Sequence, residues 1–204
     1  MFRRTMKDVT DENLIKNFLE GDVKSFEELV HRYEIPLMGF LQRYTGNYQE
    51  AEEVFQETFL RVYTKAQRFD PERSFKTWVY TIALNLARTA LKRRYSAHVL
   101  ARSDHEGGNQ DKIILEGEAP EEYSAESVQE RSEVSELIRD AVLSLPEKQR
   151  DVFVLYQYQN LCYTEIASVL GRPVGTIKSQ MHYAIQALRD RLKDIRSFRC
   201  QNGN

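Results

Sequence analysis

Apolar residues recur every three or four positions along most of this 204-residue chain, as they do on the buried face of an α-helix. The spacing predicts four helices in the first half of the chain, at about 11–20, 23–44, 49–66 and 74–95. The helical period returns at Val134 and again after Pro146, which suits the first turn of a helix. Because no stretch alternates apolar and polar residues as a strand does, the sequence predicts an all-α fold.

Near the C-terminus two amphipathic segments meet at a tight corner. A short helix is expected to end at Gly171, since glycine adopts the left-handed conformation of a helix C′ position cheaply. Pro173 cannot continue that helix, so a new one starts at about 173–176. The expected buried side of this second helix consists of Ile177, Met181, Ala184, Ile185, Leu188 and Leu192. The arrangement is a helix-turn-helix, whose second helix can enter the major groove of DNA.

Helical periodicity is poor between residues 96 and 132, where glycines and one proline stand among acidic and small polar residues. Residues 104–136 contain eleven acidic and two basic residues, so this stretch carries a charge of −9. The whole chain carries −2, which leaves +7 for the remainder. We therefore expect two small helical domains joined by an acidic flexible linker, with limits at 1–97, 98–132 and 133–204.

The helix expected at 49–66 has an acidic face opposite its apolar one. The residues of this face are Glu50, Glu52, Glu53, Gln56 and Glu57. Acids near a helix N-terminus complement the helix dipole and stay solvated, and this ordinary explanation suffices for them. A cluster this dense also suits the docking of a basic partner, and composition alone does not decide between the two interpretations.

The helix expected at 74–95 carries a polar and cationic face, made of Thr77, Thr81, Asn85, Arg88 and Lys92. Such a face suits a nucleic-acid strand, because cations hold phosphates and nearby aromatic rings such as Trp78 and Tyr80 can stack on unpaired bases. An ordinary solvated face explains the pattern as well. Trp78 falls on the apolar stripe, which favours a place in the core.

Composition argues against several classes of function. The histidines His31, His98, His105 and His182 are scattered, and no phosphate loop or nucleophile motif occurs, so we expect no catalysis, metal or cofactor. Cys162 and Cys200 fit free thiols in a reducing cytoplasm. With a mean hydropathy of −0.58, no apolar run approaching about 20 residues and no signal-peptide pattern, we expect a cytoplasmic protein without membrane insertion.

Three segments, at residues 50–69, 74–88 and 145–188, resemble in order the conserved regions of bacterial sigma-70 factors of the extracytoplasmic-function (ECF) group. The first is similar to the region-two helix that docks on the clamp helices of RNA polymerase. The second is similar to the segment that melts and holds the minus-10 strand, and the third to region four, which reads the minus-35 element. The resemblance implies a non-catalytic initiation factor that binds core RNA polymerase and promoter DNA. A stand-alone helix-turn-helix regulator that never engages polymerase is the competing hypothesis.

The resemblance also implies roles for particular residues. Those expected to bind core polymerase are Glu50, Glu53, Phe55, Gln56 and Glu57. Those expected on minus-10 DNA are Phe75, Lys76, Thr81, Asn85, Arg88 and Lys92, with Asn85 placed where a flipped base is received. Those expected on minus-35 DNA are Arg172, Thr176, Lys178, Ser179, Gln180, His182 and Tyr183. The acidic linker would run through the polymerase active-site channel, and an anti-sigma factor is a further implied partner.

The recognition helix departs from the family pattern. Family members usually carry arginines at the positions of Gln180 and Tyr183, and often a basic residue at Gln186. Each lost bidentate base contact removes roughly 1–3 kcal/mol of discrimination, which predicts weaker or altered reading of the minus-35 element. Cys162 stands where the family tends to have a serine N-cap, at a cost of about 1 kcal/mol, while Glu165 keeps its capping-box position.

Overall fold

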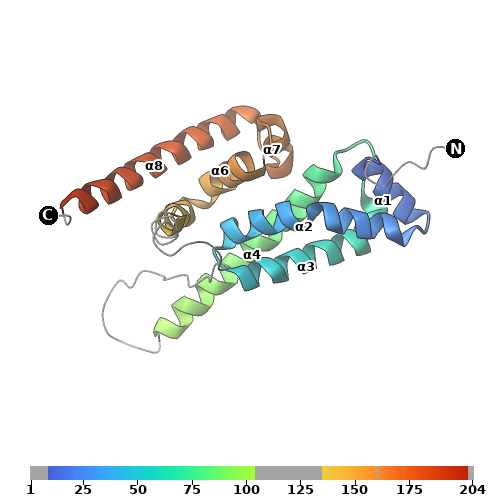
Figure 1. Cartoon of the computed structure of the whole chain (residues 1–204), viewed down its shortest axis with the longest axis horizontal. Helices are drawn as coiled ribbons and strands as arrows, with labels where there is room; N and C mark the ends of the chain where they lie inside the picture. The colour runs from blue at the N-terminus through green and yellow to red at the C-terminus, as the bar shows by residue number, and fades with distance from the viewer. Residues whose placement is uncertain (1–8, 104–134, 160, 202–204) are drawn as a thin grey trace, which may run out of the picture. The chain divides into compact units, whose positions relative to one another are not determined.

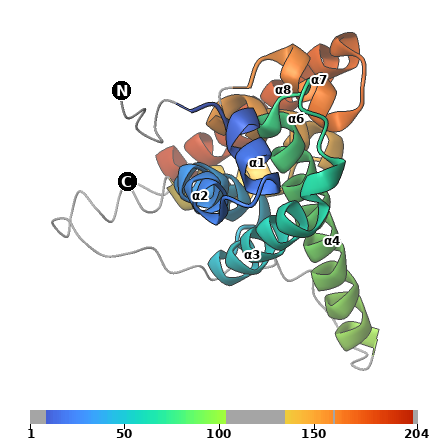
Figure 2. The same cartoon turned by 90° about the vertical axis from the view of Figure 1, so that its right-hand side faces the viewer.

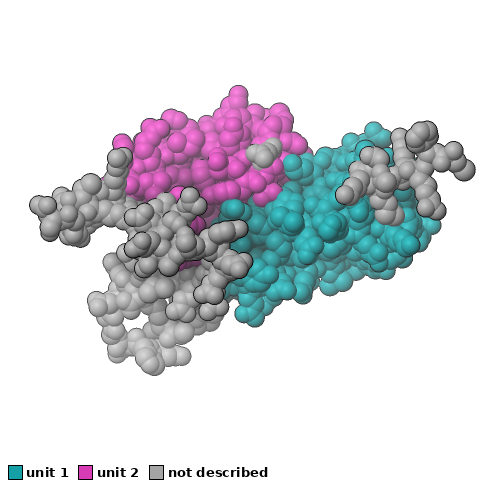
Figure 3. Space-filling model, viewed as in Figure 1, with its two compact units in different colours: residues 1–115 teal, residues 116–204 magenta. Residues whose placement is uncertain are grey.

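The computed structural model describes residues 9–103, 135–159 and 161–201, and every regular element in these residues is helical. The all-α prediction is therefore confirmed. The chain divides into two compact units, residues 1–115 and 116–204, each with its own core (Figures 1 and 3). The point of division, and most of the expected linker, fall within 104–134, outside the described residues.

In the first unit the described elements are α1 (Asp11–Leu19), α2 (Val23–Thr45), α3 (Tyr48–Lys65), the 3₁₀ turn η2 (Ala66–Arg68) and α4 (Phe75–Ser103). α2 packs against α1, α3 and α4, and α3 also packs against α4. Both views show α2 and α3 side by side (Figures 1 and 2). All four helices contribute to one core, whose fully buried members include Leu14, Leu29, Leu37, Phe40, Leu41, Tyr44, Val62, Val79, Tyr80 and Leu84.

α4 is longer than the sequence pattern predicts. Its expected end was near Tyr95, yet the helix continues to Ser103, so the expected limit at residue 97 between domain and linker falls inside it. The prediction was wrong because it followed the apolar period, which fades where the helix leaves the core. Residues 96–103 contain no Gly or Pro and include Ala, Leu and Arg, whose intrinsic helix propensity is high enough to extend the helix.

In the second unit a helix over residues 135–143 precedes α6 (Glu147–Gln159), α7 (Tyr163–Leu170) and α8 (Val174–Gln201). α8 packs against both α6 and α7. The buried apolar side chains include Ala141, Val142, Val152, Leu155, Leu161, Ile166, Val169, Ile177, Met181, Ala184 and Leu188.

The predicted burial of two residues of α8 is wrong. Ile185 is 45% exposed and Leu192 36% exposed. α6 has 13 residues and α7 has 8, so together they cover only a narrow strip of the much longer α8. That strip follows Ile177, Met181, Ala184 and Leu188, and Ile185 and Leu192 lie outside it.

Candidate nucleic-acid and protein interfaces

The outer side of α3 presents polar and acidic side chains to solvent. Glu53 and Gln56 are exposed on it, and Glu57 lies beside them. Glu57 also pairs with Arg61 one turn further along, with 2.8 Å between Oε1 and Nε. Both side chains of this pair are about two-fifths exposed, so the pair adds little stability and leaves the carboxylate accessible to a partner. The ring of Phe55 is half-buried instead, packed 5.0 Å from Phe59.

Glu50, the first acid of the expected docking set, is engaged inside the protein. Its Oε2 lies 3.0 Å from Nη1 of Arg94 on α4, and each side chain is 22% exposed. The Nη2 of Arg94 donates a second hydrogen bond, 3.0 Å long, to the carbonyl of Thr45 at the end of α2. The guanidinium of Arg94 therefore connects α2, α3 and α4, and Glu50 provides its contact on α3. The sequence pattern did not show it, because Glu50 and Arg94 are far apart in the chain.

The polar face of α4 follows one side of the helix, as expected. Asn85 and Lys92 are exposed, while Lys76, Thr81 and Arg88 are partly exposed. The Nη1 of Arg88 donates to Oδ1 of Asn85 at 3.3 Å. This contact orients the amide of Asn85 with its oxygen toward Arg88, so the two Nδ2 hydrogens can donate to a nucleic-acid base.

Two aromatic residues do not belong to this face. Phe75, expected among the DNA contacts, is 0% exposed, with its ring centroid 5.7 Å from that of Phe69 and 5.9 Å from that of Trp78. Tyr80, considered as a stacking platform, is also buried, and this burial raises the pKa of its hydroxyl. Phe75 is therefore not a DNA contact and Tyr80 is not a stacking platform, because each of these aromatic residues, at helical spacing, packs in the core. The expected placement of Trp78 against the core agrees with its ring contacts to Phe69 and Phe75.

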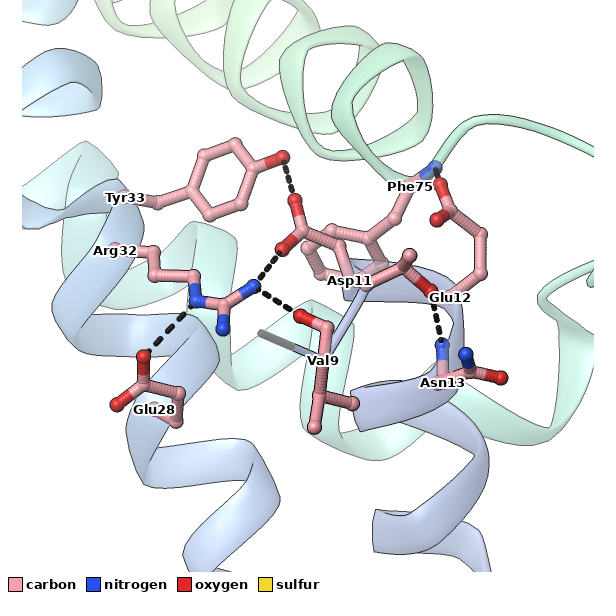
Figure 4. A network of polar contacts seen from close by, with 9 residues as sticks. Val9, Asp11, Glu12, Asn13, Glu28, Arg32, Tyr33 and Phe75 are labelled. Carbon is pink, nitrogen blue, oxygen red and sulfur yellow. Dashed lines mark hydrogen bonds and ion pairs between the residues drawn. The ribbon is translucent and has the colours of Figure 1, made fainter. Parts of the chain in front are cut away.

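The start of α4 is capped from two sides. Ser74 accepts the backbone N–H of Thr77 through Oγ at 3.4 Å. Glu12 of α1 accepts the N–H of Phe75, the first residue of α4, through Oε1 at 2.9 Å (Figure 4). The first N–H groups of a helix have no partner within it, and a carboxylate there also complements the helix dipole. Sequence spacing carries no signal for Glu12, because this contact joins residues 63 positions apart.

A network of ion pairs fastens α1 to α2 (Figure 4). Asp11 accepts from Nη1 of Arg32 at 2.8 Å and from the hydroxyl of Tyr33 at 2.7 Å. Arg32 also binds Glu28 and the carbonyl of Val9. Burial is the main cause that raises the pKa of Tyr33, and the hydrogen bond to Asp11 adds to it. Burial lowers the pKa of Arg32, but its hydrogen bonds to Glu28 and Asp11 outweigh burial and raise it.

The predicted helix-turn-helix is confirmed in α7 and α8. Gly171 ends α7 in the left-handed conformation, with φ of 61°. At the other end of α7, Oε2 of Glu165 accepts the backbone N–H of Cys162 at 2.7 Å, which is the reciprocal contact of a capping box. The Sγ of Cys162 lies 2.9 Å from the hydroxyl of Thr164.

The outer side of α8 carries most of the residues expected on minus-35 DNA. Thr176, Lys178, Ser179, His182 and Tyr183 are exposed, as is Gln186, and Gln180 is partly exposed. The Ser179 hydroxyl donates to the carbonyl of Gly175, one turn before it. The rings of His182 and Tyr183 meet edge to face at 5.8 Å. These polar and aromatic side chains are therefore accessible to a partner along the first turns of α8.

Arg172 lies apart from that surface. Its Nη2 is 3.8 Å from Oδ2 of Asp151, a residue of α6 that is 0% exposed. Asp151 was not identified from the sequence, because a single acid within a helical segment gives no sign of burial.

Among residues 9–103, 135–159 and 161–201, no group of three His, Cys, Asp or Glu side chains is placed to hold a metal ion. Within the same residues, no helix is both long and apolar enough to cross a membrane.

Comparisons with known proteins agree with the two units. The family model of sigma-70 region 2 matches residues 29–96, and that of sigma-70 region 4 matches residues 135–188. The ECF RNA polymerase sigma factor SigW of Bacillus subtilis is 34% identical over 184 residues, which are 89% of this chain and 96% of that protein. The RNA polymerase sigma-H factor of Pseudomonas aeruginosa is 30% identical over 188 residues, covering 91% and 95%.

Solved structures share the fold at lower identity. CnrH, solved with the cytosolic domain of CnrY, superposes with a TM-score of 0.66 at 21% identity, over 90% of this chain and 97% of that one. The sigma factor RpoE of Bartonella quintana, solved with the anti-sigma factor NepR, gives a TM-score of 0.60 at 22% identity, over 83% and 98%.

Proposed function

The chain belongs to the ECF group of sigma-70 factors, and on this basis we propose how its two units act. It is an alternative initiation subunit that binds core RNA polymerase, directs it to promoters through minus-10 and minus-35 elements, and assists melting without catalysing any reaction itself. The first unit, up to the end of α4 at Ser103, supplies polymerase docking and minus-10 recognition, the acidic stretch that follows is the linker, and residues 133–204 read the minus-35 element. The observation that carries this proposal is that each family match contains one solvent-facing surface suited to DNA.

On α4 the cations and the amide have different tasks. Lys76, Arg88 and Lys92 hold phosphates of the separated minus-10 strand, because their charges attract the backbone of any sequence. Asn85 reads a base, because an amide offers both a donor and an acceptor and Arg88 already fixes its orientation. Thr81 donates its hydroxyl to the carbonyl of Thr77, so it offers the strand an acceptor oxygen.

On α8 the chemistry points to an altered minus-35 element. Thr176, Lys178, Ser179 and His182 provide contacts to phosphates and base edges. Gln180 and Tyr183 stand where the family's arginines would favour guanine, Gln186 stands where a basic residue is frequent, and glutamine amides pair best with adenine. We therefore expect this factor to discriminate less through guanine than the family pattern implies.

Protein partners meet the first unit on α3. Glu53, Gln56 and Glu57 form the exposed side that docks core polymerase, whereas Glu50 supports the fold through Arg94. An anti-sigma factor that sequesters the protein in the cytoplasm is a further partner, by analogy with the family. A stand-alone regulator would have no use for a region-two domain, so the match over residues 29–96 favours the initiation subunit.

The test is assembly with core polymerase. Purified chain mixed with core enzyme is expected to form a one-to-one complex, measured by native mass spectrometry. This complex should direct transcription from a subset of promoters. The proposal would be contradicted if the chain did not bind core polymerase and instead dimerised on palindromic DNA.

A further inference from the structure

Arg172 was expected to contact promoter DNA, but its surroundings indicate another role. It lies in the corner between α7 and α8, and its guanidinium turns inward toward Asp151 of α6 at 3.8 Å. Asp151 is 0% exposed, and the Arg172 side chain is 24% exposed. The Nη1 of Arg172 is buried as well. A guanidinium in this position is withdrawn from the surface where Lys178 and Tyr183 lie exposed.

We propose that Arg172 is a positioning residue, which sets the recognition helix α8 against α6 through its ion pair with Asp151. The inference rests on the proposed reading of a minus-35 element by α8. It assigns Arg172 and Asp151 to the aiming of that helix and leaves the DNA contacts to the exposed side chains of α8.

The backbone shows why one side chain at this position controls two helices. The N–H of Arg172 donates to the carbonyl of Ala167 at 3.1 Å, which completes the end of α7. The next residue, Pro173, accepts the N–H of Ile177 at 3.1 Å, which begins the hydrogen bonding of α8. Arg172 therefore sits where α7 ends and α8 begins, and holding its side chain on α6 fixes the direction in which α8 leaves the corner.

Electrostatics favours the inward position. A carboxylate removed from water is costly unless a cation or hydrogen-bond donors compensate it. If Arg172 swung out to a DNA phosphate, the buried Asp151 carboxylate would lose from among its partners the cation that now lies 3.8 Å away. In the inward position the two charges cancel at short range, so Arg172 adds little attraction for DNA. Lys178, exposed on α8, has no such constraint and serves as the matched control.

Salt dependence separates a positioning residue from a phosphate contact. The full chain, assembled with core polymerase, is assayed on a promoter selected by the wild-type holoenzyme from a library randomised at minus-35. Variants Arg172→Met, Asp151→Asn, their double and Lys178→Met are compared. Each lost phosphate contact lowers the slope of log affinity against log salt by about one. Lys178→Met should show this loss, whereas the double variant, which removes both charges of the pair together, should keep the wild-type slope.

The second readout is discrimination between the selected minus-35 sequence and a scrambled one. The double variant removes both charges of the pair together and leaves neither one behind in the protein, so it is expected to stay folded. We expect its discrimination to fall about tenfold, no further than in the worse single variant, because both residues act through one contact. Opening that depends only on minus-10 should be unchanged.

The proposal is overturned if the double variant loses about one unit of slope, as Lys178→Met does, or if it keeps full discrimination. The first result would make Arg172 a phosphate contact, and the second would make the pair merely structural. Failure of the proposed function looks different, because wild-type chain would then select no promoter at all.

Discussion

Glu50 and Glu53 lie one turn apart on α3, and exchanging each for glutamine should affect a different property. Glu50→Gln should lower stability, whereas Glu53→Gln should weaken polymerase binding. Glu50→Gln removes the charge from a contact with Arg94 in which both side chains are only 22% exposed. Hydrogen bonds between charged groups contribute about 1.5–3 kcal/mol, and the lower value is appropriate for a pair that water still reaches. A loss of about 1.5 kcal/mol should lower the Tm of a unit this size by roughly 6–12 °C. Glu53→Gln changes an exposed side chain and should alter stability by less than about 0.5 kcal/mol.

Two assays distinguish the variants. Thermal unfolding followed by circular dichroism should show a lower Tm for Glu50→Gln but not for Glu53→Gln. Arg94→Gln should also lower the Tm, and its effect should not add to that of Glu50→Gln. Titration with core polymerase below the unfolding transition should show weaker binding for Glu53→Gln and near-normal binding for Glu50→Gln. If Glu50→Gln kept the wild-type Tm but lost polymerase affinity, the ion pair would be dispensable and Glu50 would belong to the docking surface after all.

Three further predictions concern the DNA face, the corner and alkaline pH. Asn85→Ala should reduce minus-10 selectivity in promoter opening while core binding stays intact; equal losses in both would indicate misfolding. Gly171→Ala should lower the free energy of unfolding by about 1 kcal/mol in urea titrations, because φ of 61° strains a residue with a Cβ, and an unchanged value would refute this. Buried Tyr33 and Tyr80 keep their protons in the folded protein above their ordinary pKa. Stability should therefore be intact below about pH 10 and fall above it by up to about 1.4 kcal/mol per pH unit and tyrosine. Tyr80→Phe should flatten that fall, and an identical pH profile would contradict the burial argument.

Much of the fold could be predicted because its determinants are local. Apolar spacing locates every described α-helix, and Gly171 with Pro173 locates the corner of the helix-turn-helix. The end of α4 was missed because helix propensity outlasts the apolar pattern beyond Tyr95. The burial of Ile185 was predicted wrongly because the apolar period identifies the apolar side of a helix. It does not show how much of that side the neighbouring helices cover.

The candidate surfaces were predictable only in part, because residue type does not reveal a partner distant in the chain. Glu50 resembles Glu53 in sequence, yet Arg94 draws it into an internal contact. The sequence likewise indicates that Arg172 is a DNA-binding cation, but in the structure it pairs with the buried Asp151. Phe75 followed the family pattern for a DNA contact, but its burial places it in the core.

The central claim is that two separate DNA surfaces on one chain direct core polymerase. Its most direct test is run-off transcription by the reconstituted holoenzyme on a selected promoter and on two derivatives, scrambled at minus-10 or at minus-35. The account predicts transcripts from a single start site, abolished by the first change and reduced by the second. Transcription that is indifferent to both elements, or that needs no added chain, would contradict it.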